Sequence, residues 1–98
     1  MSPKRAIDPE ARVEIREAAR WYGDRSPQAR IDFLAAVADA FIRIVQAPQR
    51  WPASSYGTRR FVLGRFPFSI VYLNEPSLIY VVAVAHHKRK PGSWKQRL

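Results

Sequence analysis

Two adjacent histidines, His86 and His87, and the cations after them are the residues of this chain whose types best suit chemistry. They follow residues 78–85, a run of apolar and aromatic side chains that is typical of a buried β-strand. An apolar strand that ends in ionisable groups gathers those groups at one edge of a sheet. Such an edge is suited to holding a polyanion or to moving protons.

Histidine is the side chain that most readily exchanges a proton near neutral pH, so His86 or His87 could act as a general acid or base. Neighbours in a strand point to opposite faces, so at most one of the two would face a given site. In the alternative reading, one histidine hydrogen-bonds locally and the other is solvated. With no cysteine and no well-spaced third histidine, the pair makes a poor zinc site, so we expect neither a metal ion nor a cofactor.

Cations from two parts of the chain could form one surface for phosphate groups, because a planar guanidinium binds phosphate oxygens in pairs. Trp94 adds an aromatic face on which a nucleobase could stack. Alternatively, a turn at Pro91 and Gly92 lets Trp94 fold back and pack the tail onto the body. We predict His86, His87 and Arg89 as catalytic residues, and as substrate-binding residues Arg60, Arg65, Lys90, Trp94, Lys95 and Arg97.

The positive charge of the chain is concentrated in its second half. The net charge of the 98 residues is +9. Residues 47–98 carry nine Lys or Arg against one acid, whereas residues 1–46 carry eight against seven. A one-sided positive field attracts nucleic acid or an acidic protein, although a basic surface can also serve solubility alone. Among the acids, we expect Asp8, Glu14 and Glu17 on the surface of a helix, with no paired-carboxylate site.

The composition excludes several classes of protein. The absence of cysteine excludes disulfides and thiolate metal sites and fits a reducing compartment. No apolar run approaches the roughly 20 residues of a membrane span, and no apolar segment follows residues 1–5 as in a secretory signal. We therefore expect one cytoplasmic domain over residues 1–98, without a membrane partner.

The first half of the chain predicts two helices. Asp8 followed by Pro9 is a helix start, and Gly23 is expected to end that helix. Ser26 and Pro27 start a second helix, which ends near residue 47 because Pro48 disfavours a helical residue before it. Two helices joined by few residues form an antiparallel hairpin. The apolar stripe of the second helix is Leu34, Val37, Ala38, Phe41, Ile44 and Val45, broadened by Ile31 and Phe33.

The second half predicts strands at residues 59–63, 68–73 and 78–85, and residues 4–7 give a weak signal for one more. Residues 78–85 are apolar on both faces, so this strand should be central in the sheet. We therefore expect an α+β fold. In it, an N-terminal antiparallel helical hairpin packs on a small, mainly antiparallel sheet of three to four strands, followed by a basic C-terminal tail.

Residues 60–63, 66–72 and 83–94 resemble the RelE/ParE family of type II toxin–antitoxin toxins. The last of these segments reads AVAHHKRKPGSW and is most similar to the plasmid-stabilisation branch, in which the strand end reads roughly A-H-x-x-R-x-P-x-Y-W. Residues 18–22 and 47–52 also look like that branch. The similarity extends over nearly the whole chain and is weakest at the first strand.

The resemblance implies a small toxin that is neutralised by a cognate acidic antitoxin and that meets operator DNA only through this antitoxin. RelE-type members cut mRNA on the ribosome without a metal, using basic residues, sometimes a histidine, and often a tyrosine. ParE-type members inhibit DNA gyrase. The histidine-ended basic strand favours an mRNA endoribonuclease slightly. The alternative is a non-enzymatic inhibitor that binds gyrase through exposed hairpin residues such as Arg16 and Arg20.

Two residues depart from the ribonuclease pattern of that family. Ser69 follows Phe68 where RelE-type ribonucleases commonly have an arginine. Ser93 stands where the branch usually has a tyrosine, and a serine cannot stack on a base. Both departures weaken the nuclease interpretation. They also allow a third one, an attenuated toxin that only binds its antitoxin.

Overall fold

The structure is a computed structural model, and it describes residues 4–98. Of residues 1–5, where no signal segment is expected, the first three lie outside the described part. The predicted α+β class and the helical hairpin are confirmed. None of the helices within residues 4–98 is both long enough and apolar enough to cross a membrane. The elements are β1 (Lys4–Ile7), α1 (Pro9–Arg25), α2 (Pro27–Gln46), β2 (Arg59–Val62), β3 (Phe68–Asn74) and β4 (Leu78–His86), with short 3₁₀ turns at Ser55–Gly57 and Lys95–Arg97.

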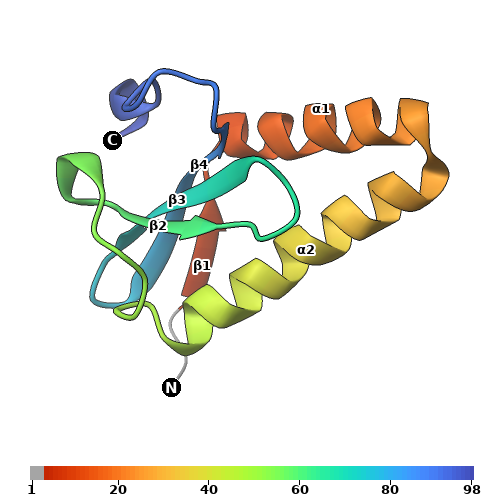
Figure 1. Cartoon of the computed structure of the whole chain (residues 1–98). Helices are drawn as coiled ribbons and strands as arrows, with labels where there is room; N and C mark the ends of the chain where they lie inside the picture. Colours follow the sequence, from red (N-terminus) through yellow and green to blue (C-terminus); the bar gives the residue numbers. More distant parts are fainter. Residues whose placement is uncertain (1–3) are drawn as a thin grey trace.

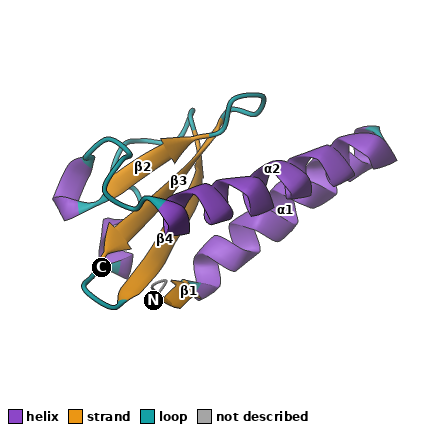
Figure 2. Cartoon of the chain, turned by 90° about the horizontal axis from the view of Figure 1, so that it is seen from below, coloured by secondary structure: helices purple, strands orange, loops and turns teal. Residues whose placement is uncertain are grey.

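The four strands form one sheet in the order β1-β4-β3-β2 (Figure 1). β1 runs parallel to β4, and the other two pairings are antiparallel. β4 lies between β1 and β3, so the prediction of a central last strand is confirmed, as is the weakly predicted first strand. Figures 1 and 2 show α1 and α2 side by side, extending beyond the sheet.

Both helices begin as the sequence predicts, but α1 continues past Gly23. Asp8 accepts a hydrogen bond from the Glu10 N–H at 2.9 Å, and the Ser26 hydroxyl caps α2 by accepting from the Ala29 N–H at 3.3 Å. α1 ends only at Arg25, and the C-cap residue Ser26 has an extended φ of −163°, as expected for the residue before a proline. Gly23 lies inside the helix, at a point where a Cβ would come within 3.2 Å of the Arg30 side chain.

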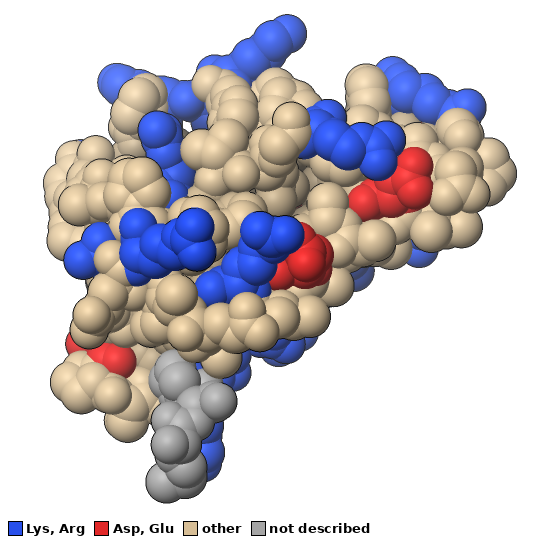
Figure 3. Space-filling model, turned by 60° about the horizontal axis from the view of Figure 1, so that its bottom comes forward, with Lys and Arg blue, Asp and Glu red and all other residues tan. Residues whose placement is uncertain are grey.

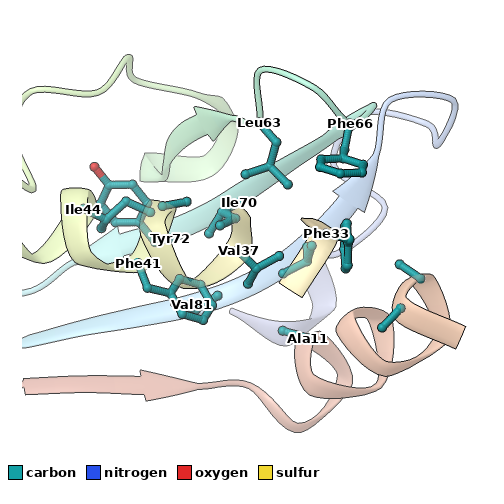
Figure 4. Packing of buried hydrophobic residues seen from close by; sticks show 14 of the residues in the cluster. Ala11, Phe33, Val37, Phe41, Ile44, Leu63, Phe66, Ile70, Tyr72 and Val81 are labelled. Atoms are coloured by element: carbon teal, nitrogen blue, oxygen red, sulfur yellow. The ribbon is translucent and has the colours of Figure 1, made fainter. Parts of the chain in front are cut away.

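The core between the helices and the sheet is built on Phe33 (Figure 4). Phe33 is fully buried, stacks on Tyr22 at 5.2 Å between ring centroids, and contacts Phe66 and Phe68 edge-on. Leu34 was predicted in the core stripe but is 38% exposed. The predicted stripe is confirmed at Phe33 and wrong at Leu34, and also at Ile31 and Ala38, which are exposed, because α2 turns the Phe33 side of its surface toward this cluster. The buried residues of α2 are Phe33, Val37, Ala40, Phe41 and Ile44.

A second, smaller core lies on the opposite face of the sheet. There Val71, Val82 and Ala83 are buried together with Trp94 of the C-terminal tail. Trp94 is only 5% exposed, so the alternative in which the tail folds back is the one observed. The tail (blue in Figure 1) thus covers the sheet face that the helices leave open.

Glu14 and Arg97 hydrogen-bond to the part of β4 that extends beyond the end of β1. The pairing of β3 with β4 shifts register between Val71 and Tyr72, and β1 pairs no further than Val81. Beyond that point the Val84 N–H donates to Glu14 at 3.0 Å, and Arg97 donates to the Val82 carbonyl at 3.1 Å. Two side chains therefore satisfy backbone groups that a longer β1 would have paired.

Candidate functional site

A cavity of about 190 Å³ opens beside the C-terminal tail, on the sheet face that the helices do not cover. Arg60 of β2 pairs with Val71 of β3, and Ser69 lies two residues before Val71, so all three share one face. The residues after β4 form the opposite wall. We call this the cationic cavity, and its polar lining comprises Ser54, Ser55, Arg60, Ser69, His86, His87, Arg89 and Lys90.

His87 is held in this cavity by Ser69. The Ser69 hydroxyl lies 3.0 Å from Nε2 of His87, and the His87 N–H donates to the Pro67 carbonyl at 2.8 Å. Ser69 is only 3% exposed. Its hydroxyl therefore contacts the imidazole from within the cavity wall and orients it.

His86 is turned toward the helix side of the sheet. Its ring packs edge-on against Phe68 at 4.9 Å, and its Nδ1 accepts the Lys88 N–H at 3.0 Å. The two histidines thus face different surroundings, as expected for neighbours at a strand end. Both histidines line the cationic cavity, but only His87 is held there by Ser69.

Arg89 connects the cationic cavity to α1. Its guanidinium donates to Glu14 at 3.0 Å and remains half exposed. Glu14 is itself only 9% exposed and Asp8 8%, so the expectation of helix-surface acids was wrong for these two and is confirmed for Glu17 alone. The physical reason is that Glu14 lies under the tail, where Arg89, Arg97 and a free strand N–H all donate to its carboxylate.

Two predicted substrate-binding residues are instead used to fold the tail. Arg97 makes a bidentate ion pair with Glu14, at 2.8 and 3.1 Å, and its side chain is 9% exposed. The hydrogen bonds from Arg97 to Glu14 raise the pKa of Arg97, so it stays charged. Trp94 is buried in the second core and offers no free face for a base. Both residues are therefore corrected from surface contacts to structural ones.

Arg65 and Lys95 lie away from the cationic cavity. Arg65 is in the connection between β2 and β3, where its guanidinium is 3.8 Å from Asp32 of α2. Lys95 extends over the Tyr56 ring, 6.0 Å from its centroid. Of the nine predicted site residues, the cationic cavity is lined by six, namely the buried Trp94 and the cationic or imidazole groups of Arg60, His86, His87, Arg89 and Lys90.

Sequence reasoning missed the loop that closes the outer wall of the cavity. Ser54 and Ser55 line it, and Tyr56 packs edge-on against Trp94 at 6.1 Å. Tyr56 has a φ of 59°, a left-handed conformation that is uncommon for a tyrosine. The sequence marks this stretch only as a loop, and no periodic pattern connects it to the distant tail.

A larger, more apolar groove lies on the other side of Arg89. It encloses about 350 Å³ between α1 and the ends of β3 and β4. Arg89 and His86 border this groove as well as the cationic cavity. We call it the aromatic groove, and its main lining residues are Glu17, Trp21, Tyr22, Phe68, His86 and Arg89.

Positive charge dominates the surface of the molecule. Lys and Arg outnumber Asp and Glu on the face seen in Figure 3, in keeping with the net charge of +9. Within residues 4–98, no group of three His, Cys, Asp or Glu side chains lies close enough together to bind a metal ion.

A family model described as the ParE toxin of the type II toxin–antitoxin system parDE matches residues 6–91. The chain belongs to the ParE toxin family. As such it is a toxin with an antitoxin partner. The ParE-like fold also occurs in the chromosomal ParDE toxin–antitoxin system from P. aeruginosa, with a TM-score of 0.76 and 15% identity, over 87% of this chain and 96% of the other. No curated protein matches the chain.

Proposed function

We propose that this ParE-family toxin inhibits DNA gyrase by binding it, without cutting RNA. The observation that carries the proposal is that several of the predicted nuclease residues are engaged in packing and are not free to act on a substrate. His86 and His87 face different surroundings, and Trp94 and Arg97 are buried in the packing of the tail. Gyrase inhibition is also the activity that the resemblance implies for ParE-type members.

Metal-free RNA cleavage needs a base on the attacking hydroxyl and an acid on the leaving oxygen, at opposite sides of one phosphate. His86 and His87 both line the cationic cavity beside three cations, but the His86 ring packs on Phe68 and its Nδ1 already accepts the Lys88 N–H. These groups suffice to bind an anion. They do not form the pair of proton-transfer groups that rapid cleavage requires, and Ser93 replaces the usual tyrosine of the branch.

The outer surface of the hairpin is the proposed contact with gyrase. Arg12, Arg16 and Arg20 are spaced by four residues, so they lie along one flank of α1. All three are exposed, and within residues 4–98 none of them forms an ion pair. α2 adds exposed aliphatic side chains, with Ile31 58% and Ile42 55% exposed. Arginines beside aliphatic groups are typical of protein-binding surfaces.

The antitoxin is proposed to be acidic and to cross the sheet face over the cationic cavity. The surplus of cations in the second half of the chain favours such a partner through charge complementarity. Operator DNA would then be reached only through the antitoxin.

The proposal is tested with one preparation of the purified chain in two assays. We expect loss of supercoiling by gyrase and intact mRNA in a purified translation system with ribosomes. Ribosome-dependent cuts with normal supercoiling would reject the proposal. Activity in neither assay would instead favour the attenuated toxin that only binds its antitoxin.

Ribosome-dependent mRNA cleavage is kept as the second candidate because of the pairing of Ser69 with His87 among cations. In this mechanism His87 would be the base, and Arg60, Arg89 and Lys90 would bind the phosphate. The Ser93→Tyr variant is expected to cut mRNA faster than the unchanged chain if this candidate is correct. If neither protein cut mRNA, this second candidate would be rejected.

A further inference from the structure

We propose that one flank of the helical hairpin holds the phosphate backbone of duplex DNA while the toxin is bound to gyrase. This flank, which we call the arginine ridge, consists of Arg12, Arg16 and Arg20 of α1 and Arg30 of α2. The proposal rests on the proposed inhibition of gyrase, and it assigns these arginines to the DNA on which gyrase acts. Phosphate contacts carry no sequence information, so this binding is distinct from recognition of operator DNA.

The arginine ridge is a straight row of cations. Residues four apart follow one another along one side of a helix, about 6 Å apart along its axis, as do Arg12, Arg16 and Arg20. Gly23 continues this side of α1, and the stem of the Arg30 side chain lies beside it, 3.2 Å from where a Cβ would be. Arg30 therefore extends the row, which is about 16 Å long from Arg12 to Gly23.

The four arginines of the ridge are available to a partner. All four are exposed, and within residues 4–98 none of them forms an ion pair. Glu17 and Asp24 are three and four residues from Arg20, at spacings that allow a pair, yet neither of them forms one. Like charges four residues apart repel one another, so an anion that contacts the whole row relieves this repulsion as it binds.

A regular polyanion is the partner that fits such a row. Each strand of B-DNA carries a phosphate about every 3.4 Å along the helix axis, so a ridge of about 16 Å can reach about four phosphates of one strand. The planar fork of each arginine binds phosphate oxygens in pairs. The geometry therefore favours contact with the backbone of a duplex.

The surroundings of the ridge disfavour single-stranded nucleic acid and membranes. Proteins that bind single strands stack the bases on aromatic rings, whereas the exposed Trp21 lies about 140° around α1 from Arg16 and lines the aromatic groove. A helix that lies on a membrane exposes an apolar face beside its cations. The apolar face of α1 is instead buried in the core, through Ala11, Ala18 and Ala19.

The salt dependence of DNA binding tests the ridge without gyrase. The probe is a short fluorescein-labelled DNA duplex of random sequence, whose affinity for the toxin is read by fluorescence anisotropy. The variant replaces all four ridge arginines, as Arg12→Gln, Arg16→Gln, Arg20→Gln and Arg30→Gln. Each phosphate contact contributes about 0.9 to the slope of log affinity against log salt concentration, so the slope should become shallower by about 3 to 4.

A charge-matched control separates the ridge from the net charge of the chain. It combines Arg43→Gln, Arg50→Gln, Lys88→Gln and Lys95→Gln, which remove the same charge from exposed positions outside the ridge. Its slope should change by less than about 1. Equal changes in the two variants would show that net charge alone attracts DNA and would overturn the proposal. Loss of binding to single-stranded RNA, with duplex binding unchanged, would assign the ridge to RNA and also overturn it.

A radical-cleavage experiment locates the DNA in the complex with gyrase. Because the chain has no cysteine, Val13→Cys accepts a single iron chelate, three residues before Arg16 and therefore beside the ridge. The control is Val62→Cys on β2, at the opposite edge of the sheet from β1, where Val62 is 51% exposed. We expect cuts in the DNA bound by gyrase from the Val13 position and none above background from the Val62 position.

The two measurements distinguish failure of the ridge from failure of the proposed function. Gyrase that is inhibited by the Val13 conjugate, with its DNA uncut, would overturn the proposal, because the ridge would then face protein. Gyrase that is not inhibited by the unchanged chain would reject the proposed function. The salt dependence on free DNA involves no gyrase, so it decides on the ridge in either case.

Discussion

At the scale of single residues, Glu14 is a buried carboxylate that connects three parts of the structure. Its carboxylate accepts hydrogen bonds from Arg89, from Arg97 and from the Val84 N–H, all at 2.8–3.1 Å. The tail, the first helix and the central strand therefore meet at one buried charge. Removing one partner of such a buried pair is costly because the other charge remains without compensation.

Glu14→Gln is expected to lower the free energy of unfolding by about 3 kcal/mol, since Arg97 loses its buried counter-charge. Glu10→Gln is the matched control. Glu10 also contacts Arg97, at 3.2 Å, but it is 68% exposed, so its loss should cost less than about 1 kcal/mol. Denaturant unfolding measures both. Equal losses would show that Glu14 is an ordinary surface acid.

Tyr72 is expected to make the free energy of unfolding fall as the pH rises into the alkaline range. Burial raises the pKa of Tyr72 to about 12, with Arg59 acting in the opposite direction, and its hydroxyl donates to the Pro48 carbonyl at 2.6 Å. The unfolded chain releases this proton near pH 10 and the folded chain near pH 12. The stabilisation is complete below about pH 10 and is lost as the pH rises to about 12.

Unfolding free energies at about pH 9 and about pH 11 test this dependence. Between them the unchanged protein should lose on the order of 1–2 kcal/mol more than Tyr72→Phe, which has no phenol to ionise at this position. Tyr72→Phe also loses a hydrogen bond at both pH values, so only the difference in slope is informative. Parallel slopes for the two proteins would contradict the assignment.

At the scale of elements, the C-terminal tail depends on close approach between Gly92 and Tyr56. Gly92 has a φ of 77°, and a Cβ there would lie 2.9 Å from the Tyr56 ring. Both features disfavour any other residue. The wall of the cationic cavity therefore depends on one glycine that neither binds nor reacts.

Gly92→Ala is expected to destabilise the tail by about 1–2 kcal/mol, because a left-handed backbone and a steric clash act together. Amide exchange at residues 93–98 should accelerate, while exchange in the helices stays unchanged. Gly64→Ala is the control, since a Cβ on Gly64 would meet no other atom within 4 Å and the φ of this residue is not positive. Similar behaviour of the two variants would mean that the tail does not need this contact.

Elements were predictable where a local signal determines them. Caps and prolines located the starts of α1 and α2, and an apolar run located β4 as the central strand. The choice between Phe33 and Leu34 was not predictable, because periodicity allows both and only the distant Tyr22 and Phe66 decide it. Gly23 was misleading because it lies within α1 beside the Arg30 side chain and not in a turn.

The candidate site was less predictable than the fold. The cations of the site could be named from the sequence. The buried Arg97, however, has the same sequence pattern as an exposed arginine, so the sequence does not distinguish the two. Its burial depends on Glu14, which is 83 residues away in sequence. Likewise, nothing in the sequence predicted the contact between Ser69 and His87, because the register of β3 against β4 brings these two residues together.

At the scale of the whole molecule, the charge of +9 should govern the strength of binding to an acidic antitoxin. Raising the salt concentration from about 0.05 M to about 0.5 M is expected to weaken that binding at least about 10-fold, because screening acts on exposed charge pairs. Titration calorimetry at several salt concentrations measures this. In the Arg60→Ala, Arg89→Ala double variant the dependence should flatten. An affinity that changes neither with salt concentration nor with these substitutions would contradict the electrostatic account.

The hairpin and the sheet face thus have separate proposed tasks, with gyrase on the exposed helices and the antitoxin over the cationic cavity. The two surfaces come from different halves of the chain. Substitutions in one should therefore leave the binding properties of the other intact. This separation is the central claim about the molecule, and it distinguishes inhibition by binding from catalysis in the cavity.

The most direct test of that claim is the toxin concentration that half-inhibits supercoiling by gyrase, measured for three proteins. Relative to the unchanged chain, the Arg16→Ala, Arg20→Ala double variant is predicted to need at least about 10-fold more protein, equivalent to about 1.4 kcal/mol of binding. His87→Ala is predicted to stay within about 2-fold. Loss of inhibition with His87→Ala, while the double variant inhibits normally, would contradict the account and move the function to the cavity.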